Sequence, residues 1–457
     1  MTVPGHGARG RALAIYTHLS RANVRSHPFS IIHRPCGIAS PALPCLTARM
    51  TNIADYVSFR DSKLASRYLG KGTKISMSTL FEAYLDGKVD IPDMDAFLDA
   101  RPELVKYTIT DDHLKFFFTR MIPEVAIHSK AQDERIVRDH YDRGDDFFAA
   151  FLGDRMVYTS GIFTSEKQSL EQSQDDKIDL VCSKLMLKPG ERLLDIGCGW
   201  GTLTMRAAKV WGADATGVTI SKNQTAFGNK RIESNGVKDT ARLVCKDYRD
   251  INEGPFDKIS SLEMVEHVGL KNVPLYCKTV YNLLKDDGLF LLQWTGLRRG
   301  GPQLGVPVIG LRPEDLIWGL FMNKYIFSGA DASLTLSDMC KFMEKAGFEI
   351  QSAENVSIHY AITIQRWHKN WQENREQVLK TYGERWYRLW HLFLGWSWRI
   401  AMQGNAACFQ ILANKNLDTF NRRIFIGQNP LARPAAVGTR PNLPAHVNGN
   451  GTVAEAE

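Results

Sequence analysis

The stretch "LLDIGCGWG" (193–201) constrains the fold more than any other part of the chain, because a short apolar run passes directly into a turn with three glycines. Further apolar runs follow at 213–221, 241–247, 256–264 and 289–296, each separated from the next by a helical pattern. Strands that alternate with helices of roughly ten to fifteen residues predict an open parallel α/β sheet. The glycine turn then lies at the carboxyl edge of that sheet, where such folds bind ligands.

Helical additions flank the predicted sheet. Residues 51–175 have mainly helical periodicity, and the Gly/Pro-rich segment at about 297–330 is too long for a simple connection. We expect a helix at 336–349, a strand at 352–367 and an aromatic-rich helix at 384–402. The predicted organisation is a leader at 1–50, a helical region at 51–175, an α/β domain at 176–430 that contains this insertion, and a disordered tail at 431–457.

Composition narrows the class of protein. The 457 residues are 44% hydrophobic and 23% charged, which is typical of a globular protein with a large core. The net charge of +7 favours a solvated basic face or a membrane-surface partner, and we expect no nucleic-acid partner. The eight cysteines form no CxxC pair and no pattern of metal ligands, so we expect a reducing compartment and no metal. No stretch reaches the roughly 18 apolar residues of a membrane-spanning helix.

The first 49 residues hold arginines at 9, 11, 21, 25, 34 and 49 but no Asp, Glu or Lys. An Arg-rich, acid-poor leader is typical of an organellar transit peptide. The alternative is an untranslated leader, since Met50 opens a more ordinary sequence. Both interpretations stay open.

The glycine turn carries a nucleoside-binding signal. Gly197, Gly199 and Gly201 have no Cβ and therefore let the backbone approach a ligand closely. Their GxGxG spacing is one residue tighter than that of dinucleotide-binding folds, and Asp195 at the strand end is more typical of methyltransferases. The next strand ends in "GVTIS", which offers hydroxyl groups where a dinucleotide fold would need an acid.

The stretch "SSLEMVEHVG" (260–269) gathers charged groups just after another strand. Glu263, Glu266 and His267 follow an apolar run within a few residues of one another. Charges at such a place are costly to desolvate unless they are paired or take part in chemistry. The pattern therefore predicts an acid–base site.

Five motifs, in this order, resemble the cyclopropane-fatty-acid synthase family: "YTSGIF", "LLDIGCGWG", "GVTISKNQ", "CKDYRD" and "MVEHVG". Between about 73 and 429, "FEAYLDGKVD", "IWGLFMNKYIF" and "HYAITIQRWHKNW" are similar to the fungal sphingolipid C9-methyltransferases. The resemblance implies a Rossmann-like class I S-adenosylmethionine methyltransferase core with a helical N-terminal region and helical acceptor-binding additions. It implies a sphingolipid substrate, ceramide or glucosylceramide. The fungal enzymes carry N-terminal membrane spans, where this sequence has its Arg-rich leader.

The same resemblance implies where the cofactor binds. Tyr158 and Thr159 would hold its methionine end, residues 219–224 its ribose, and Tyr248 with Arg249 its adenine. The implied cofactor residues are Tyr158, Thr159, Leu193, Leu194, Asp195, Ile196, Gly197, Cys198, Gly199, Trp200, Gly201, Thr219, Ile220, Ser221, Lys222, Asn223, Gln224, Tyr248 and Arg249.

The implied reaction adds a methyl group to carbon 9 of a sphingoid C8=C9 alkene, which leaves positive charge on the neighbouring carbon until a proton is lost. In the cyclopropane synthases a bicarbonate ion, held by a Cys, a Glu, a His and a Tyr, serves this step. Glu266 and Tyr360 match the Glu and the Tyr, while Ser160 and Gln293 replace the Cys and the His. Hydroxyl and amide groups still hydrogen-bond an anion or a water, so bicarbonate and water are both open as the second bound group, with Glu266 as the expected base.

Other functions stay open at this point. Glu263, Glu266 and His267 form the ExxEH arrangement of plant alkaloid N-methyltransferases, which methylate small amines. A cyclopropane synthase acting on phospholipid acyl chains and a catalytically silent membrane-surface module are the further alternatives.

A lipid substrate implies a membrane-associated, peripheral enzyme, at the endoplasmic reticulum in the case of a sphingolipid. Two segments could contact the bilayer: the Trp- and Arg-rich run at 384–401 and the run "IWGLF" at 317–321. The alternative for the first segment is that its aromatic residues form part of the core.

Overall fold

The computed structural model describes residues 51–121, 132, 135, 143–298, 312–330 and 332–427, which belong to one compact unit. The predicted leader and the predicted tail lie outside the described residues, as does the middle of the insertion at 297–330.

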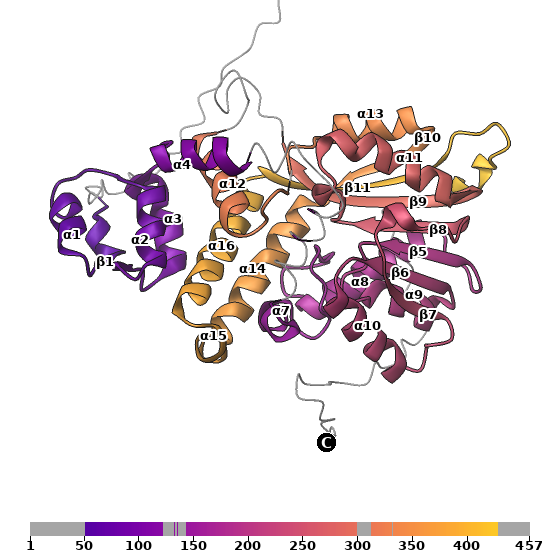
Figure 1. The fold of residues 1–457 in the computed structure, drawn as a ribbon, viewed down its shortest axis with the longest axis horizontal. Coiled ribbons are helices and arrows are strands. Elements are labelled where there is room, and N and C mark those ends of the chain that lie inside the picture. The colour runs from indigo at the N-terminus through magenta and orange to yellow at the C-terminus, as the bar shows by residue number, and fades with distance from the viewer. Residues whose placement is uncertain are drawn as a thin grey trace, which may run out of the picture. The chain divides into compact units, whose positions relative to one another are not determined.

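A seven-stranded sheet in the order β10-β11-β9-β8-β5-β6-β7 forms the α/β region (Figure 1). The parallel strands predicted from the sequence are all present: β5 (Arg192–Ile196), β6 (Asp214–Thr219), β7 (Ala241–Cys245), β8 (Phe256–Leu262) and β9 (Leu284–Leu297). The helices before and between them are α8 (Leu170–Lys184), α9 (Thr202–Trp211), α10 (Lys222–Ser234) and α11 (Val273–Leu283). Central strands such as β5 are buried on both faces, which explains their continuous apolar sequence.

The sheet is completed by two strands from the C-terminal part of the chain. Strand β11 (Ala406–Lys415) is buried along its whole length and runs antiparallel to both β9 and β10 (Phe348–Asn355). The sequence analysis did not predict β11. The otherwise parallel sheet therefore has one antiparallel strand inserted near its edge.

The strand predicted at 352–367 is wrong over most of its length. Only its first residues belong to β10, and the chain then forms helix α14 (Ser357–Glu373). The β-branched residues of "SIHYAITI" favour a strand locally, but Ala361, Ile364, Trp367 and Trp371 recur at helical spacing on the buried face. Burial of that face decides the conformation.

The N-terminal region is helical, as predicted, with short strands between its helices. Its helices are α1 (Ser62–Tyr68), α2 (Met77–Leu85), α3 (Met94–Leu104), α4 (Asp111–Phe116) with a π-helical turn at Phe117–Met121, and α7 (Asp145–Leu152). The two-residue strands pair as β1 (Ser58–Phe59) with β3 (Val89–Asp90) and β2 (Ile75–Ser76) with β4 (Val105–Lys106).

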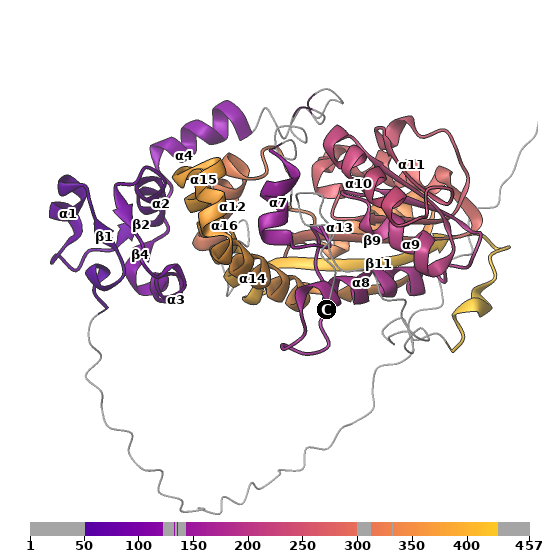
Figure 2. The same ribbon diagram turned by 90° about the horizontal axis from the view of Figure 1, so that it is seen from below.

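Four C-terminal helices pack against this N-terminal region. They are α12 (Pro313–Tyr325), α14, α15 (Arg375–Tyr382) and α16 (Glu384–Met402). Helix α13 (Leu336–Ala346) packs instead against α11 and β10 of the α/β region. Helices α14 and α16 lie side by side in both views (Figures 1 and 2). A single hydrophobic cluster joins Phe97 of α3, Phe147 of α7, Trp367 of α14 and Trp390 of α16. The predicted helical region 51–175 and these four C-terminal helices thus share one core.

The Trp- and Arg-rich helix α16 is part of that core, so of the two interpretations of this segment the core is confirmed and the membrane surface is wrong. Trp390 and Trp396 have no exposed surface. Arg388 is also buried and pairs with Asp90 at 2.5 Å, while Arg399 pairs with Asp95 at 3.0 Å. Buried guanidinium groups persist where carboxylates and carbonyls satisfy them.

The second predicted membrane surface, 317–321, is buried as well. It lies in α12, where Ile317 and Phe321 are 1% exposed and the Trp318 indole donates a hydrogen bond to Ser397 Oγ at 3.1 Å. In the described residues, no helix combines the length and the apolarity that crossing a membrane requires.

Candidate functional site

The glycine turn connects β5 to α9 and lies at the carboxyl edge of the sheet, as predicted. Gly197 has a φ of 78°, and a Cβ there would lie 2.6 Å from the Met264 side chain. Gly199 has a φ of 53°, but a Cβ there would meet nothing within 4 Å. The first glycine is therefore required by the fold, whereas the second faces open space that a ligand can fill.

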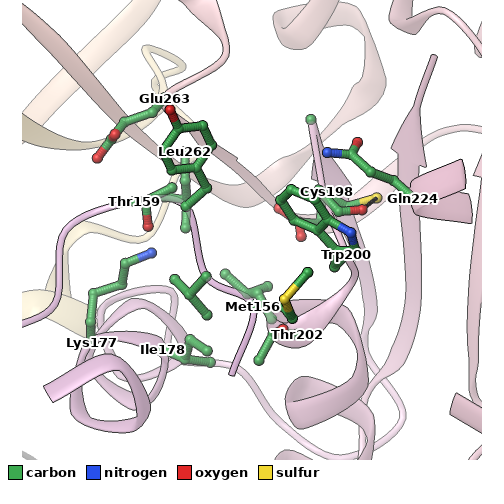
Figure 3. Close-up of a pocket in the computed structure, with 16 residues that line it drawn as sticks. Met156, Thr159, Lys177, Ile178, Cys198, Trp200, Thr202, Gln224, Leu262 and Glu263 are labelled. Carbon is green, nitrogen blue, oxygen red and sulfur yellow. Dashed lines mark hydrogen bonds between the residues drawn. The ribbon is translucent and has the colours of Figure 1, made fainter. Parts of the chain in front are cut away.

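Two hollows meet at this turn. Gly197, Gly199, Gln224 and Glu263 line both hollows. Figure 3 shows the first hollow, with Trp200 and Gln224 on one side of it and Thr159 and Lys177 on the other.

Most of the residues predicted to hold the cofactor line these hollows. They are Tyr158, Thr159, Asp195, Ile196, Gly197, Cys198, Gly199, Trp200, Thr219, Ile220, Gln224, Tyr248 and Arg249. The predicted residues that line neither hollow are Leu193, Leu194, Gly201, Ser221, Lys222 and Asn223. Leu193 and Leu194 are buried in β5, and Lys222 and Asn223 point to solvent.

The polar side chains around the hollows are held in place by local hydrogen bonds. Ser221 caps helix α10 by accepting from the Gln224 N–H at 3.2 Å, and the Gln224 Oε1 accepts from Thr219 Oγ1 at 2.8 Å. Asp195 is buried and accepts hydrogen bonds from Ser260 and Thr204. Burial raises the pKa of Asp195 to about 6. These bonds order the rim before a ligand arrives.

The second hollow contains an aromatic ring with a cation above it. The Arg249 guanidinium lies 5.4 Å from the centre of the Tyr248 ring and pairs with Asp247 at 2.6 Å. Tyr248 packs edge-to-face on Tyr276, with ring centres 5.4 Å apart. An ordered aromatic ring at the rim suits a flat base.

The sequence analysis missed Lys177 and Asp247, which also line the hollows. Lys177 is 1% exposed, and in Figure 3 its amino group points into the first hollow on the side of Thr159. Burial lowers the pKa of Lys177 to about 8, against the opposing influence of Glu263. The available signal was its position on the apolar face of α8, one residue before Ile178 and four before Val181.

Glu263 is the first residue after β8 and has a φ of 55°, which is unusual for a residue with a side chain. Its Oε1 accepts hydrogen bonds from the Ser160 backbone N–H at 3.2 Å and from Gln293 Nε2 at 2.6 Å. Burial raises the pKa of Glu263, and the charge of Lys177 together with these hydrogen bonds limits the rise. The structure thus brings Ser160 and Gln293 together on Glu263.

Glu266 lies in a 3-10 turn, Val265–His267, close to Glu263. One oxygen accepts a hydrogen bond from the Thr295 N–H, while Oε2 is buried and has no partner among the described residues. Burial, and then the charge of Glu263, raise the pKa of Glu266 to about 8. Glu266 is therefore mostly protonated at neutral pH.

Tyr360 and His267 complete the surroundings of the acidic pair. Tyr360 lies in α14, and burial and then the charge of Glu263 raise the pKa of its hydroxyl. His267 lines the second hollow, with its ring 6.2 Å from that of Phe327.

Comparison with known proteins identifies the family. The model of the mycolic acid cyclopropane synthetase family matches residues 128–411. The chain belongs to this family. The sphingolipid C9-methyltransferase of Komagataella phaffii is 46% identical over 399 residues, which cover 83% of this chain and 79% of the relative. Sphingolipid C9-methyltransferase 2 of Gibberella zeae is 45% identical, with coverage of 81% and 70%.

Comparison with solved structures supports the assignment of the chain to this family. The cyclopropane synthase MmaA2 from Mycobacterium tuberculosis has a TM-score of 0.58 and 29% identity, and the match covers 62% of this chain and 98% of that chain. The mycolic acid cyclopropane synthase CmaA1, complexed with SAH and CTAB, has a TM-score of 0.58 and 26% identity, with coverage of 64% and 100%. This family member is therefore an S-adenosylmethionine-dependent methyltransferase with a Rossmann-like class I core.

Proposed function

We propose that this enzyme methylates carbon 9 of the sphingoid base of ceramide or glucosylceramide. The observation that carries the proposal is the 46% identity over 399 residues with a relative named sphingolipid C9-methyltransferase. Five further relatives with that name are 41–45% identical over at least 80% of this chain. Coclaurine N-methyltransferase shares only 16% identity and supports the fold alone, so small-amine methylation is the weaker hypothesis.

The residues around the two hollows fit S-adenosylmethionine, which supplies an electrophilic methyl group when it is bound. Gly199 leaves space for the nucleoside, Gln224 lies where both hollows meet, and Tyr248 offers its ring to the adenine. Tyr158 and Thr159 line the first hollow near Glu263 and would orient the methionine end. The buried Thr159 hydroxyl has no hydrogen-bond partner among the described residues, as expected of a group that serves a ligand.

Methyl addition to an alkene needs a pocket that excludes water and accepts a proton. The electron pair of the double bond forms the new carbon–carbon bond and leaves positive charge on the neighbouring carbon. Loss of the proton on carbon 9 returns its electron pair to the double bond. Glu263 is half-buried and lines both hollows, where its carboxylate supplies negative charge and a proton acceptor.

The product decides between this proposal and a cyclopropane synthase. Purified enzyme, S-adenosylmethionine and a ceramide with a C8=C9 double bond are expected to give a lipid with one added methyl group. Methylation and cyclopropanation add the same mass, so proton NMR of the product is the deciding measurement. A vinylic methyl signal supports the proposal. Cyclopropane ring protons, or turnover of phospholipid acyl chains instead of ceramide, would contradict it.

We also propose peripheral binding to a membrane, through an apolar patch made of Ile109, Leu114, Phe117 and Phe118. These side chains are 38–64% exposed and lie on or beside α4. The exposed cations of Lys106, Lys115 and Arg120 outnumber the exposed carboxylates of the same segment, Asp111 and Asp112, by one. Apolar side chains among cations suit an anionic bilayer, and a sphingolipid substrate resides in one.

Replacement of Phe118 by serine is expected to weaken flotation with anionic liposomes roughly tenfold or more, because a buried Phe contributes about 1.5–3 kcal/mol. The matched control is Leu275→Ser, since Leu275 is 58% exposed on α11, outside the patch. Added salt is expected to weaken binding of the unmodified enzyme. Equal loss in both variants, or none in Phe118→Ser, would exclude this patch.

A further inference from the structure

Two of the residues that the family resemblance assigns to a bicarbonate ion already hold an anion of the protein itself, Gln293 through its side chain and Ser160 through its backbone. Ser160, Gln293, Glu266 and Tyr360 are the four assigned positions. The Ser160 N–H and the Gln293 amide both donate to Glu263 Oε1, at 3.2 and 2.6 Å. The Cys408 thiol also donates to the same oxygen, at 3.7 Å, so the Gln293 amide, the Ser160 backbone N–H and this thiol are all occupied by a carboxylate.

The orientation of the Gln293 amide is fixed by a chain of hydrogen bonds that begins at a lysine. Lys184 can only donate, and its Nζ bonds to Gln410 Oε1 at 2.6 Å. Gln410 must then present its NH₂ group, which donates to Gln293 Oε1 at 2.8 Å. Gln293 in turn presents its own NH₂ group to Glu263. The network therefore directs the Gln293 NH₂ group towards Glu263, and a hydrogen-bond donor at this place stabilises the carboxylate as an anion.

Charge around Glu263 favours its ionised form over that of Glu266. Lys177 is the neighbour whose charge acts most strongly to lower the pKa of Glu263. Glu266 has no such cation among its influences, and its Oε2 has no partner among the described residues. The negative charge of the pair is therefore favoured on Glu263 over Glu266.

The backbone at Glu263 adds an independent observation. A φ of 55° costs a residue with a side chain roughly 1–2 kcal/mol that glycine would avoid. Such strain is concentrated at functional sites, where the surrounding structure enforces it. At this position the strained conformation holds the carboxylate among its donors and at the junction of the two hollows.

We propose that the Glu263 carboxylate takes the place of bicarbonate and is the base of the reaction. This inference rests on the proposed function. After methyl transfer, the bond between carbon 9 and its hydrogen breaks, its electron pair restores the C8=C9 double bond, and the proton goes to a Glu263 oxygen. The bicarbonate site implied by the resemblance does not fit this chain, and no step requires the ion.

The decisive variant is Glu263→Gly, because glycine adopts a φ of 55° without strain. In buffer freed of carbon dioxide, the unmodified enzyme is expected to keep full turnover. Glu263→Gly is expected to lose about 10²- to 10⁴-fold in turnover, the usual effect of removing a general base. Added bicarbonate or formate is expected to restore part of that loss, because the emptied space and its donors accept a small anion.

Glu263→Gln is the matched control. Its amide fills the same space but cannot take a proton, so it is expected to lose activity as severely and to show no rescue by bicarbonate. Loss of wild-type turnover on removal of bicarbonate would overturn the proposal, as would full activity of Glu263→Gly in stripped buffer.

A second measurement separates this inference from the proposed function. Carbon-13 NMR with labelled bicarbonate needs no lipid substrate. The unmodified enzyme is expected to bind none of the label, and Glu263→Gly is expected to bind it. Bicarbonate binding to the unmodified enzyme would overturn the inference even if sphingolipid methylation is observed. Failure to methylate ceramide, with the expected binding pattern, would instead reject only the proposed substrate and the proton transfer derived from it.

Discussion

Replacement of Gly199 by valine is expected to weaken binding of S-adenosylmethionine roughly 5- to 150-fold, corresponding to about 1–3 kcal/mol of overpacking. A Cβ at Gly199 meets no protein atom within 4 Å, so the added side chain would occupy the space proposed for the nucleoside. Isothermal titration calorimetry with the cofactor measures the effect directly. Unchanged affinity would remove Gly199 from the cofactor site.

Gly236→Val provides the matched control for backbone strain. Gly236 also has a positive φ, 70°, and a Cβ there also meets nothing within 4 Å, but it lines neither hollow. Both valine variants are expected to lose similar thermal stability, because valine is unfavourable at positive φ. Only Gly199→Val is expected to lose cofactor affinity. Equal loss of affinity in both would mean that general destabilisation, and not blocking of the site, is responsible.

The parallel core was predictable because its signals are local. Each strand from β5 to β9 contains a short stretch rich in apolar and β-branched residues, and each intervening helix has its own periodicity. Strand β11 lacks such context, since it follows α16 and enters the sheet far from its sequence neighbours. For helix α14 the local signal was misleading. Its β-branched residues favour a strand, but burial of one face in the tertiary structure stabilises the helix.

The cofactor side of the site was also predictable from sequence, because one glycine turn and the ends of the strands supply it. For the acidic side of the site, the sequence predicted which residues take part but not how they contact one another. Its key contact joins Glu263 to Gln293, and the orientation of Gln293 depends on Gln410 of the unpredicted strand β11. This hydrogen-bond network joins three segments that are far apart in the sequence. None of the three segments therefore contains a sequence pattern that predicts the network.

Helix α16 shows that amino-acid composition alone does not distinguish a membrane surface from a protein core. Tryptophan and arginine side by side are typical of a membrane interface and equally of a core that contains buried ion pairs. The carboxylates that decide the question, Asp90, Asp95 and Asp99, lie about 300 positions away in the sequence. Only the tertiary structure pairs them with Arg388 and Arg399.

Replacement of Glu266 by glutamine is expected to remove a pH-dependent loss of stability. The pKa of Glu266 is raised from 4.5 to about 8 in the folded protein. Between these values the folded protein holds a proton that the unfolded chain has released, so the free energy of unfolding falls as pH rises. The loss is complete above about pH 8 and is on the order of 5 kcal/mol, since one pKa unit corresponds to about 1.4 kcal/mol.

Urea unfolding of both proteins at several pH values between about 5 and 8.5 tests this expectation. Burial lowers the pKa of His368 to about 4 and that of His391 to about 3, which gives stability an opposite slope below pH 6.5. Both proteins contain these histidines, so their contribution cancels in the difference between the two curves. Glu266→Gln is expected to gain stability over the unmodified enzyme steadily as pH rises towards 8. Parallel curves would show that Glu266 is already ionised, and the negative charge of the pair would then not reside on Glu263 alone.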